Sequence, residues 1–339
     1  MPSAATTTPA TTESRTHDAS RTPGPHTTRH TVTVWAPPRT VFGLLADVAN
    51  WPHVFGPTVH SEMLQDDGRD QLLRLWAFAG GQVRTWTSRR ELDPAAGRIV
   101  FRQTVPAAPV AAMGGEWLVE AHADGGSRVT LLHDFRAVDD DPAAVTLIGE
   151  AVERNSRAEL AALKGVAEQG EQRAELVFTF RDCEHVHGAA EDVFSFLDRA
   201  DLWPERLPHV ARLALTEDEP GVQHLDMDTR SSADGSLHNT TSVRICRPEE
   251  LTIVYKQLRV PAALAGHTGR WVIEQDSADS ARLAVTSWHT VTLDPEGVRQ
   301  ALGPAATLAE ARALVRKSLG ANSSATLRYA KEYAESRPS

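Results

Sequence analysis

Four side chains on one face of a predicted β-strand have the types needed to bind and polarise a carbonyl group. Alternation along QVRTWTSRREL, residues 82–92, puts Arg84, Trp86, Ser88 and Arg90 on the same face. A guanidinium offers a fixed fork of donors to an oxygen on which negative charge develops. If this face points inward, burying Ser88 and Arg90 is costly unless they are needed there, which would indicate an interior site. Taken alone, the same spacing is more often that of a solvated face whose arginine pairs with a glutamate.

The same pattern occurs twice along the chain. Trp51 recurs as Trp203, 152 positions later, and Arg90 recurs as Arg244, 154 positions later. The other matched pairs keep the same order: Phe42 and Phe194, Ser88 and Ser242, Trp117 and Trp271, His133 and His289, Asn155 and Asn322, Ser156 and Ser323, Leu160 and Leu327, Lys164 and Lys331. Ordered matches at a nearly constant offset indicate a duplicated domain.

Each copy has the same order of predicted elements. An alternating strand, residues 30–36 or 175–188, leads into a short helix that ends at a Trp-Pro pair, because proline disfavours helix for the residue before it. Several strands separated by turn signals follow, and a long helix closes each copy, at about residues 142–168 and 304–335. This order predicts an α+β fold of tandem helix-grip domains, each a curved antiparallel sheet around a long C-terminal helix with an interior cavity.

The predicted domains span residues 28–170 and 174–339, after a disordered tail, residues 1–27, that is rich in Thr, Ser, Pro and Ala. The net charge of −10 argues against nucleic acid as a partner. The two cysteines, Cys183 and Cys246, cannot build a zinc cluster, and no apolar stretch is long enough for a secretory signal or a membrane span. Nucleotide-binding and serine-hydrolase motifs are absent from the sequence. We therefore expect a cytoplasmic protein with no metal and no cofactor.

Three features resemble the aromatase/cyclases of bacterial type II polyketide synthases, in the START-like helix-grip superfamily. They are the Trp-Pro pairs, the W-x-S-x-R strand and the Asn-Ser pair of the long helix. The duplication resembles the di-domain members, and the likeness covers roughly residues 28–335. It implies that Trp86, Ser88 and Arg90 are the catalytic residues, which hold and polarise the polyketide.

The resemblance also implies a lining for each cavity. The substrate-binding residues of the first cavity would be Trp51, Thr58, Trp117, His133 and Asn155. Thr58 stands where single-domain relatives have a tyrosine, so this chain lacks that phenol. The second cavity would use Ser242, Arg244, Trp203, Trp271 and His289, but Thr240 replaces the tryptophan of the strand motif. Taken singly, a tryptophan of this set is more often a core residue than a ligand wall, although the pairing between the copies fits either. Each histidine fits a satisfied core residue as well as a general base.

The family reaction closes a ring in a poly-β-ketone held on an acyl carrier protein and then removes water. The di-domain class implies a chain already reduced at one ketone, closed between C7 and C12, with other synthase components as partners. Arg84, Arg89, Arg98 or Arg102 could meet the acidic carrier protein. Two other functions fit the same fold: a START-like carrier of a polyketide or lipid without catalysis, and a division in which one copy is only a structural support. Because only the first copy keeps the tryptophan of the strand motif, we expect the ring-forming chemistry there.

Overall fold

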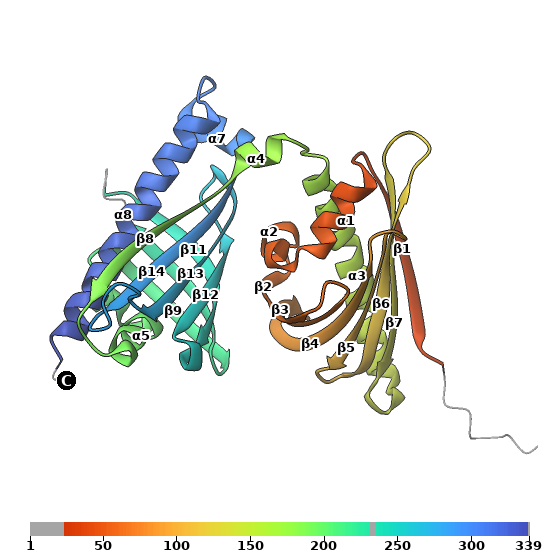
Figure 1. Cartoon of the computed structure of the whole chain (residues 1–339), viewed down its shortest axis with the longest axis horizontal. Helices are drawn as coiled ribbons and strands as arrows, with labels where there is room; N and C mark the ends of the chain where they lie inside the picture. Colours follow the sequence, from red (N-terminus) through yellow and green to blue (C-terminus); the bar gives the residue numbers. More distant parts are fainter. Residues whose placement is uncertain (1–23, 231–234, 338–339) are drawn as a thin grey trace, which may run out of the picture.

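The computed structural model describes residues 24–230 and 235–337, which form two domains of the same architecture. Each domain has a 7-stranded antiparallel sheet that curves around one long helix, and the two domains lie side by side (Figure 1). The predicted α+β fold of tandem helix-grip domains is therefore confirmed. No helix within these ranges is long and apolar enough to cross a lipid bilayer.

The strands of the first domain form one sheet, with β1 at one edge and β2 at the other. Its elements are β1 (His26–Val34), α1 (Pro38–Ala46), η1 (Val48–Asn50), α2 (Trp51–Val54), β2 (Thr58–Asp66), β3 (Asp70–Ala79), β4 (Gln82–Asp93), β5 (Arg98–Val105), β6 (Val110–Ala121), β7 (Ser127–Ala137), η2 (Val138–Asp140) and α3 (Pro142–Ala167). The strand order is β1-β7-β6-β5-β4-β3-β2. The buried stripe of α3, with Ile148, Val152, Leu160 and Leu163, packs against the sheet as its helical spacing predicts.

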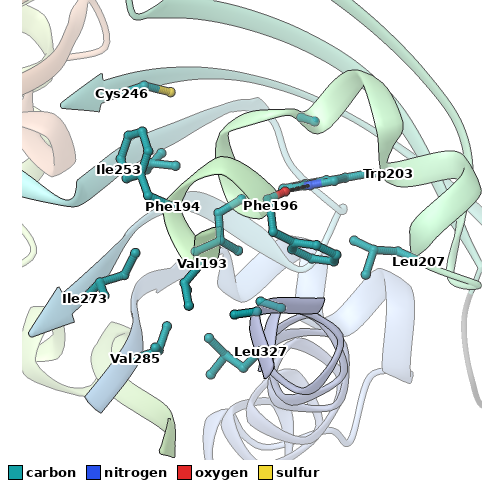
Figure 2. Packing of buried hydrophobic residues seen from close by; sticks show 14 of the residues in the cluster. Val193, Phe194, Phe196, Trp203, Leu207, Cys246, Ile253, Ile273, Val285 and Leu327 are labelled. Carbon is teal, nitrogen blue, oxygen red and sulfur yellow. Dashed lines mark hydrogen bonds between the residues drawn. The ribbon is translucent and has the colours of Figure 1, made fainter. Parts of the chain in front are cut away.

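The second domain repeats this order after a short connecting helix. Its elements are α4 (Gln172–Leu176), β8 (Val177–Val186), α5 (Ala190–Asp198), η3 (Ala200–Leu202), α6 (Trp203–Arg206), β9 (Val210–Glu219), β10 (Val222–Arg230), β11 (Leu237–Arg247), η4 (Pro248–Glu250), β12 (Thr252–Arg259), β13 (Leu264–Gln275), β14 (Leu283–Leu293), α7 (Pro295–Leu302) and α8 (Leu308–Glu335). The strand order is β8-β14-β13-β12-β11-β10-β9. Figure 2 shows the core, in which Leu327 of α8 packs with Val285 of the sheet and Phe196 of α5.

The structure corrects the local prediction at both Trp-Pro pairs. Trp51 and Trp203 do not end a helix but begin α2 and α6, and both have helical backbone angles. Proline is the second residue of each of these helices, where its missing N–H would have no intrahelical acceptor. The local preference of the residue before proline is therefore overridden.

Three boundaries also differ from the predicted ones. The strand β1 begins at His26, inside the predicted tail, because His26 pairs with Phe135; residues 1–23 of that tail lie outside the described residues. The short helix α4 lies where the two predicted domain ranges meet, so this junction is helical. The final helix begins at Leu308, where Thr307 and Glu310 form a capping box, and α7 is a separate helix before it.

The outer faces of the two sheets pack against each other. The buried cluster between them contains Val59, Trp76 and Val83 from the first domain and Val222, Val243, Ile245 and Val254 from the second. In Figure 1, α2 and β2 face the second domain, with β12 beside β2 and α2 beside β13. The ion pairs Arg247–Glu62 (2.9 Å) and Arg84–Glu219 (3.2 Å) also join the domains. The two domains therefore share a hydrophobic interface.

We expect Trp76→Ala to weaken this interface. Trp76 is 6% exposed, and truncating a buried tryptophan costs about 3–5 kcal/mol. Denaturant unfolding monitored by circular dichroism measures the loss. The matched control is Trp35→Ala, since Trp35 is 58% exposed and surface substitutions change stability by about 0.5 kcal/mol or less. An equal effect of the two substitutions would contradict a buried interface at Trp76.

Candidate functional site

A cavity of about 410 Å³ lies in the first domain between the sheet and α3. All eight residues predicted for the first site line it: Trp51, Thr58, Trp86, Ser88, Arg90, Trp117, His133 and Asn155. Much of the remaining wall is apolar and includes Leu73, Leu75, Ile99, Phe101, Met113, Ile148 and Val152. The structure therefore brings together residues from strands, from α2 and from α3 around one apolar space with few polar groups.

Strand β4 supplies the polar floor of this cavity. Arg84, Trp86, Ser88 and Arg90 line it together, as the alternation predicts. Ser88 and Arg90 are 4% and 2% exposed, so the solvated-face alternative does not hold. The hydroxyl of Ser88 donates a hydrogen bond to the carbonyl oxygen of Arg102 at 3.1 Å.

Arg90 is held by the end of the first helix. Its Nη1 donates to the carbonyl oxygen of Leu45 at 2.7 Å, and its Nη2 donates to that of Ala46, the last residue of α1. Its Nε donates to Oε1 of Gln71 at 2.6 Å. The unpaired carbonyls at a helix C-terminus attract a cation. The backbone of α1 therefore fixes the guanidinium at the cavity wall.

The guanidinium stays charged although it is buried. Burial lowers the pKa of Arg90 to about 10, and the carboxylates of Asp66 and Asp47 oppose this by favouring the charged form. Because this pKa is well above 7, Arg90 is a cation at neutral pH. An arginine that lines an apolar cavity and keeps its charge can stabilise a developing oxyanion.

Aromatic rings form the wall beside Arg90. The guanidinium lies 5.5 Å from the ring centroid of Trp51, whose indole N–H donates to the carbonyl oxygen of Leu45 at 3.2 Å. Phe55 meets Trp51 edge-on at 5.5 Å between centroids and stacks with Trp117 at 6.4 Å. These contacts fix the flat faces that a planar substrate would need.

His133 lies between the sheet and α3 and is neutral at pH 7. Its Nδ1 is 3.3 Å from Oγ of Ser156, and Phe101 packs edge-on against its ring at 5.4 Å. Burial lowers the pKa of His133 to about 4. His133 can therefore exchange hydrogen bonds with a substrate, but at neutral pH it holds no extra proton to donate. Asn155, which precedes Ser156 in α3, is half-buried at the cavity wall.

Glu159 is a cavity residue that the sequence analysis does not identify. It follows Ile148 and Val152 along the inner face of α3, and its half-buried side chain faces the cavity. Within the part of the chain that the structure describes, its carboxylate has no hydrogen bond or ion pair, and burial raises its pKa to about 7. A charged residue on an otherwise apolar helical stripe is the signal that could have identified it.

Four of the five second-site residues form a connected cluster in the second domain, namely Arg244, Trp203, Trp271 and His289, the last through Tyr255. Arg244 stacks over Trp203 at 5.1 Å and over Trp271 at 5.8 Å, and its Nη2 donates to the carbonyl oxygen of Leu197 at 2.8 Å. His289 is 3.0 Å from the hydroxyl of Tyr255, whose ring lies 4.9 Å from Trp271. Ser242 is half-buried on β11. Arg244 therefore binds the end of α5 much as Arg90 binds the end of α1.

Two substitutions change the lining between the copies. Tyr255 pairs across the sheet with Arg244 as Phe101 pairs with Arg90, and His267 stands where the first domain has Met113. The Nε2 atom of His267 is 3.1 Å from Nδ1 of His289. Burial lowers the pKa of His267 to about 3 and that of His289 to about 4, and it raises the pKa of Tyr255. Two apolar cavity-lining side chains of the first domain thus correspond to a buried polar network in the second.

A glycine in each sheet leaves room for the aromatic ring that packs edge-on against the histidine. A Cβ on Gly115 would come within 2.6 Å of the Phe101 ring, and one on Gly269 within 2.3 Å of the Tyr255 hydroxyl.

No group of three or more His, Cys, Asp or Glu side chains able to hold a metal occurs within residues 24–230 and 235–337.

The first domain matches the family model described as polyketide cyclase/dehydrase and lipid transport, over residues 25–168. The granaticin polyketide synthase bifunctional cyclase/dehydratase of Streptomyces violaceoruber is 46% identical over 314 residues, which cover 92% of this chain and 95% of the relative. The actinorhodin polyketide synthase bifunctional cyclase/dehydratase of Streptomyces coelicolor is 46% identical over 319 residues, 91% of this chain and 96% of the relative.

Two solved structures share the two-domain architecture. The match to the di-domain ARO/CYC BexL from the BE-7585A biosynthetic pathway has a TM-score of 0.82 at 46% identity. It covers 92% of this chain and 100% of the BexL chain. The di-domain ARO/CYC StfQ from the steffimycin biosynthetic pathway has a TM-score of 0.78 at 37% identity, covering 91% and 98%. These matches extend over both domains and confirm the resemblance found in the sequence. The chain belongs to the family of di-domain aromatase/cyclases, the bifunctional cyclase/dehydratases of polyketide synthases.

Proposed function

We propose that this enzyme folds a poly-β-ketone in the first-domain cavity, closes its first ring by an aldol reaction and removes water to make the ring aromatic. The observation that carries the proposal is the convergence of Arg90, Ser88 and Trp86 with aromatic walls on one apolar cavity. A substrate already reduced at one ketone, and closure between C7 and C12, follow from the resemblance to the di-domain class. The structure of the product that the minimal synthase makes with this enzyme tests both.

The reaction places two demands on the cavity. A methylene between two ketones loses a proton readily; its carbon attacks a carbonyl carbon, and the carbonyl oxygen becomes an alkoxide that takes up a proton. The resulting hydroxyl then takes up a proton and leaves as water, while a neighbouring carbon loses a proton and a C=C bond forms. Holding the chain in the reactive conformation can supply about 7–11 kcal/mol of the barrier. The first step therefore needs shape and an oxyanion partner, and the second needs a proton donor for the leaving hydroxyl.

The cavity residues suit these two demands. A guanidinium has five N–H donors, and the protein engages three of those of Arg90, so others remain for a substrate oxygen. Ser88 donates its proton to the carbonyl oxygen of Arg102, so its oxygen can accept a hydrogen bond from a water or a substrate hydroxyl. Trp86 and Trp51 can hold the enolised chain flat. Glu159, with a pKa near 7, can donate the proton that leaves with water.

An acyl carrier protein is the proposed donor of the chain, together with the other synthase components as partners. Of the four candidate arginines, three are already paired with carboxylates: Arg84 with Glu219, Arg98 with Glu116 and Arg102 with Asp134. Arg89 is exposed and has no ion pair with any residue in the described ranges. Arg89 is therefore the candidate to meet an acidic carrier.

A carrier without catalysis is the second candidate function, and the largely apolar wall favours it. An unreactive polyketide mimic would raise the melting temperature under either function. Reconstitution with the minimal synthase separates them, since a carrier would leave the product profile unchanged.

The two buried arginines provide the main test of the site. We expect Arg90→Ala to lower the rate of correct ring formation by about 100- to 1,000-fold, the usual cost of losing an oxyanion partner. Arg244→Ala should have a smaller effect on product. Both substitutions remove contacts to a helix end, so unfolding curves must first show that each variant is folded. Product profiles from the reconstituted synthase are then compared.

Two outcomes would contradict this assignment. Normal product from Arg90→Ala beside none from Arg244→Ala would move the chemistry to the second domain. Normal product from both folded variants would mean that neither arginine takes part in the reaction.

Glu159 predicts a pH dependence. If its protonated carboxyl assists dehydration, activity should fall as the pH rises through about 7, because the carboxyl then loses its proton. Glu159→Gln should lower kcat by about 100-fold and remove this transition. Glu150→Gln, on the exposed face of the same helix, is the matched control. A Glu159→Gln enzyme with the original pH profile would exclude this role.

A further inference from the structure

A lysine of the second domain binds the wall of the first-domain cavity. Lys256 lies on the outer face of β12, and its Nζ donates three hydrogen bonds to backbone carbonyl oxygens of the first domain. The acceptors are Phe55 at 3.0 Å, Gly56 at 2.8 Å and Thr58 at 2.8 Å. An ammonium group has three N–H donors, so this contact uses all of them.

The segment that Lys256 holds, residues 55–58, connects α2 to β2 and belongs to the cavity. Phe55, Pro57 and Thr58 all line it. The ring of Phe55 bridges Trp51 and Trp117, the aromatic wall beside Arg90. A displacement of residues 55–58 would therefore move the surface against which a substrate must fit.

Neighbouring contacts come from the same face of the second domain. Oγ1 of Thr268, which pairs with Lys256 across the sheet, is 2.7 Å from Nε2 of His53 in α2. Burial lowers the pKa of His53 to about 4, so this ring is neutral at pH 7 and Lys256 is not facing a second cation. Arg247 pairs with Glu62 farther along β2.

The arrangement is not repeated in the other domain. In the first sheet, Arg102 is the residue equivalent to Lys256. Arg102 pairs with Arg89 on the neighbouring strand, as Lys256 pairs with Val243 in the second sheet. It forms an ion pair with Asp134 of its own sheet. A contact present in one copy and absent from the other does not follow from the shared fold, so we look for its role at the first cavity.

We propose that Lys256 is a positioning residue, through which the second domain fixes residues 55–58 as a wall of the first-domain cavity. Its effect on product rests on the function proposed above, whereas its effect on the wall does not. Three donors directed at three carbonyls leave the segment little freedom. The second domain thereby contributes to the site without contacting the substrate.

The test replaces Lys256 by methionine, which keeps the aliphatic chain and removes the donors. Hydrogen–deuterium exchange followed by mass spectrometry measures the backbone protection of residues 53–59. Titration with anilinonaphthalene sulfonate, a fluorescent hydrophobic anion, measures binding by the cavity. We expect faster exchange in residues 53–59 and a Kd for the probe raised by about tenfold, the effect of losing a hydrogen bond from a charged donor. Reconstitution should show product shifted toward incorrect cyclisations.

Lys331→Met is the matched control, because Lys331 also donates to a backbone carbonyl, that of His185, but lies at the far side of the second domain. It should leave exchange and probe binding unchanged. If Lys256→Met does not fold, Thr268→Val removes the adjacent bond to His53 with little change of shape and should loosen residues 53–56 to a lesser degree.

The pH gives a readout that simple loss of packing would not. Burial lowers the pKa of Lys256 to about 8, and a neutral amine keeps only two N–H donors for three carbonyls. Exchange of residues 53–59, corrected for its intrinsic pH dependence, should accelerate above about pH 8 in the wild type and not in Lys256→Met.

The outcomes separate the two proposals. Unchanged exchange and probe binding in folded Lys256→Met would overturn the positioning role, whatever the enzyme makes. Faster exchange with unchanged probe binding and product would also overturn it, because the held wall would then not matter to the site. A wild-type protein that yields no cyclised product would refute the proposed function, while exchange and probe binding would still decide the role of Lys256.

Discussion

The site depends on a buried guanidinium that needs acceptors. Arg90 and Arg244 are almost fully buried, and each finds backbone carbonyls at the end of a short helix, α1 or α5. A cation without such partners could not remain in an apolar interior. The arginine of the repeated strand motif therefore orders the helix that precedes the Trp-Pro pair, in addition to facing the interior. Because both copies need this interaction for their fold, its presence alone does not identify the copy that does the chemistry.

The lining of the two interiors distinguishes the copies better. The first domain keeps Trp86, Phe101 and Met113 around an open cavity. At the corresponding positions the second domain has Thr240, Tyr255 and His267, and the last two join His289 in a buried hydrogen-bonded network. These hydrogen bonds tie the polar side chains of the second interior to one another. The same fold thus has aromatic and apolar side chains around the cavity of one copy and hydrogen-bonded polar groups at equivalent positions of the other.

The sequence predicts the features that depend on periodicity and repetition. Alternation along β4 puts Trp86, Ser88 and Arg90 on one face, and the family resemblance adds five more residues; all eight side chains line one cavity. Other residues could not be found in this way. Gln71, which binds Arg90, looks like any polar residue on a strand, and the importance of Glu159 comes from the cavity it faces. At Trp51 a local rule fails, because tertiary packing around the indole outweighs the preference of a residue before proline.

The domain interface is the feature least accessible from sequence, and it changes what the second copy can contribute. In an isolated helix-grip domain the outer face of the sheet would meet water, so Val83 on β4 would be an exposed hydrophobic residue. Here Val83 and Trp76 are covered by Val243 and Ile245 of the other sheet. Beside this apolar contact, Lys256 adds three bonds that act on the cavity wall of the first domain. A duplicated domain can therefore contribute to catalysis without contacting the substrate, because its outer surface shapes the cavity of its neighbour.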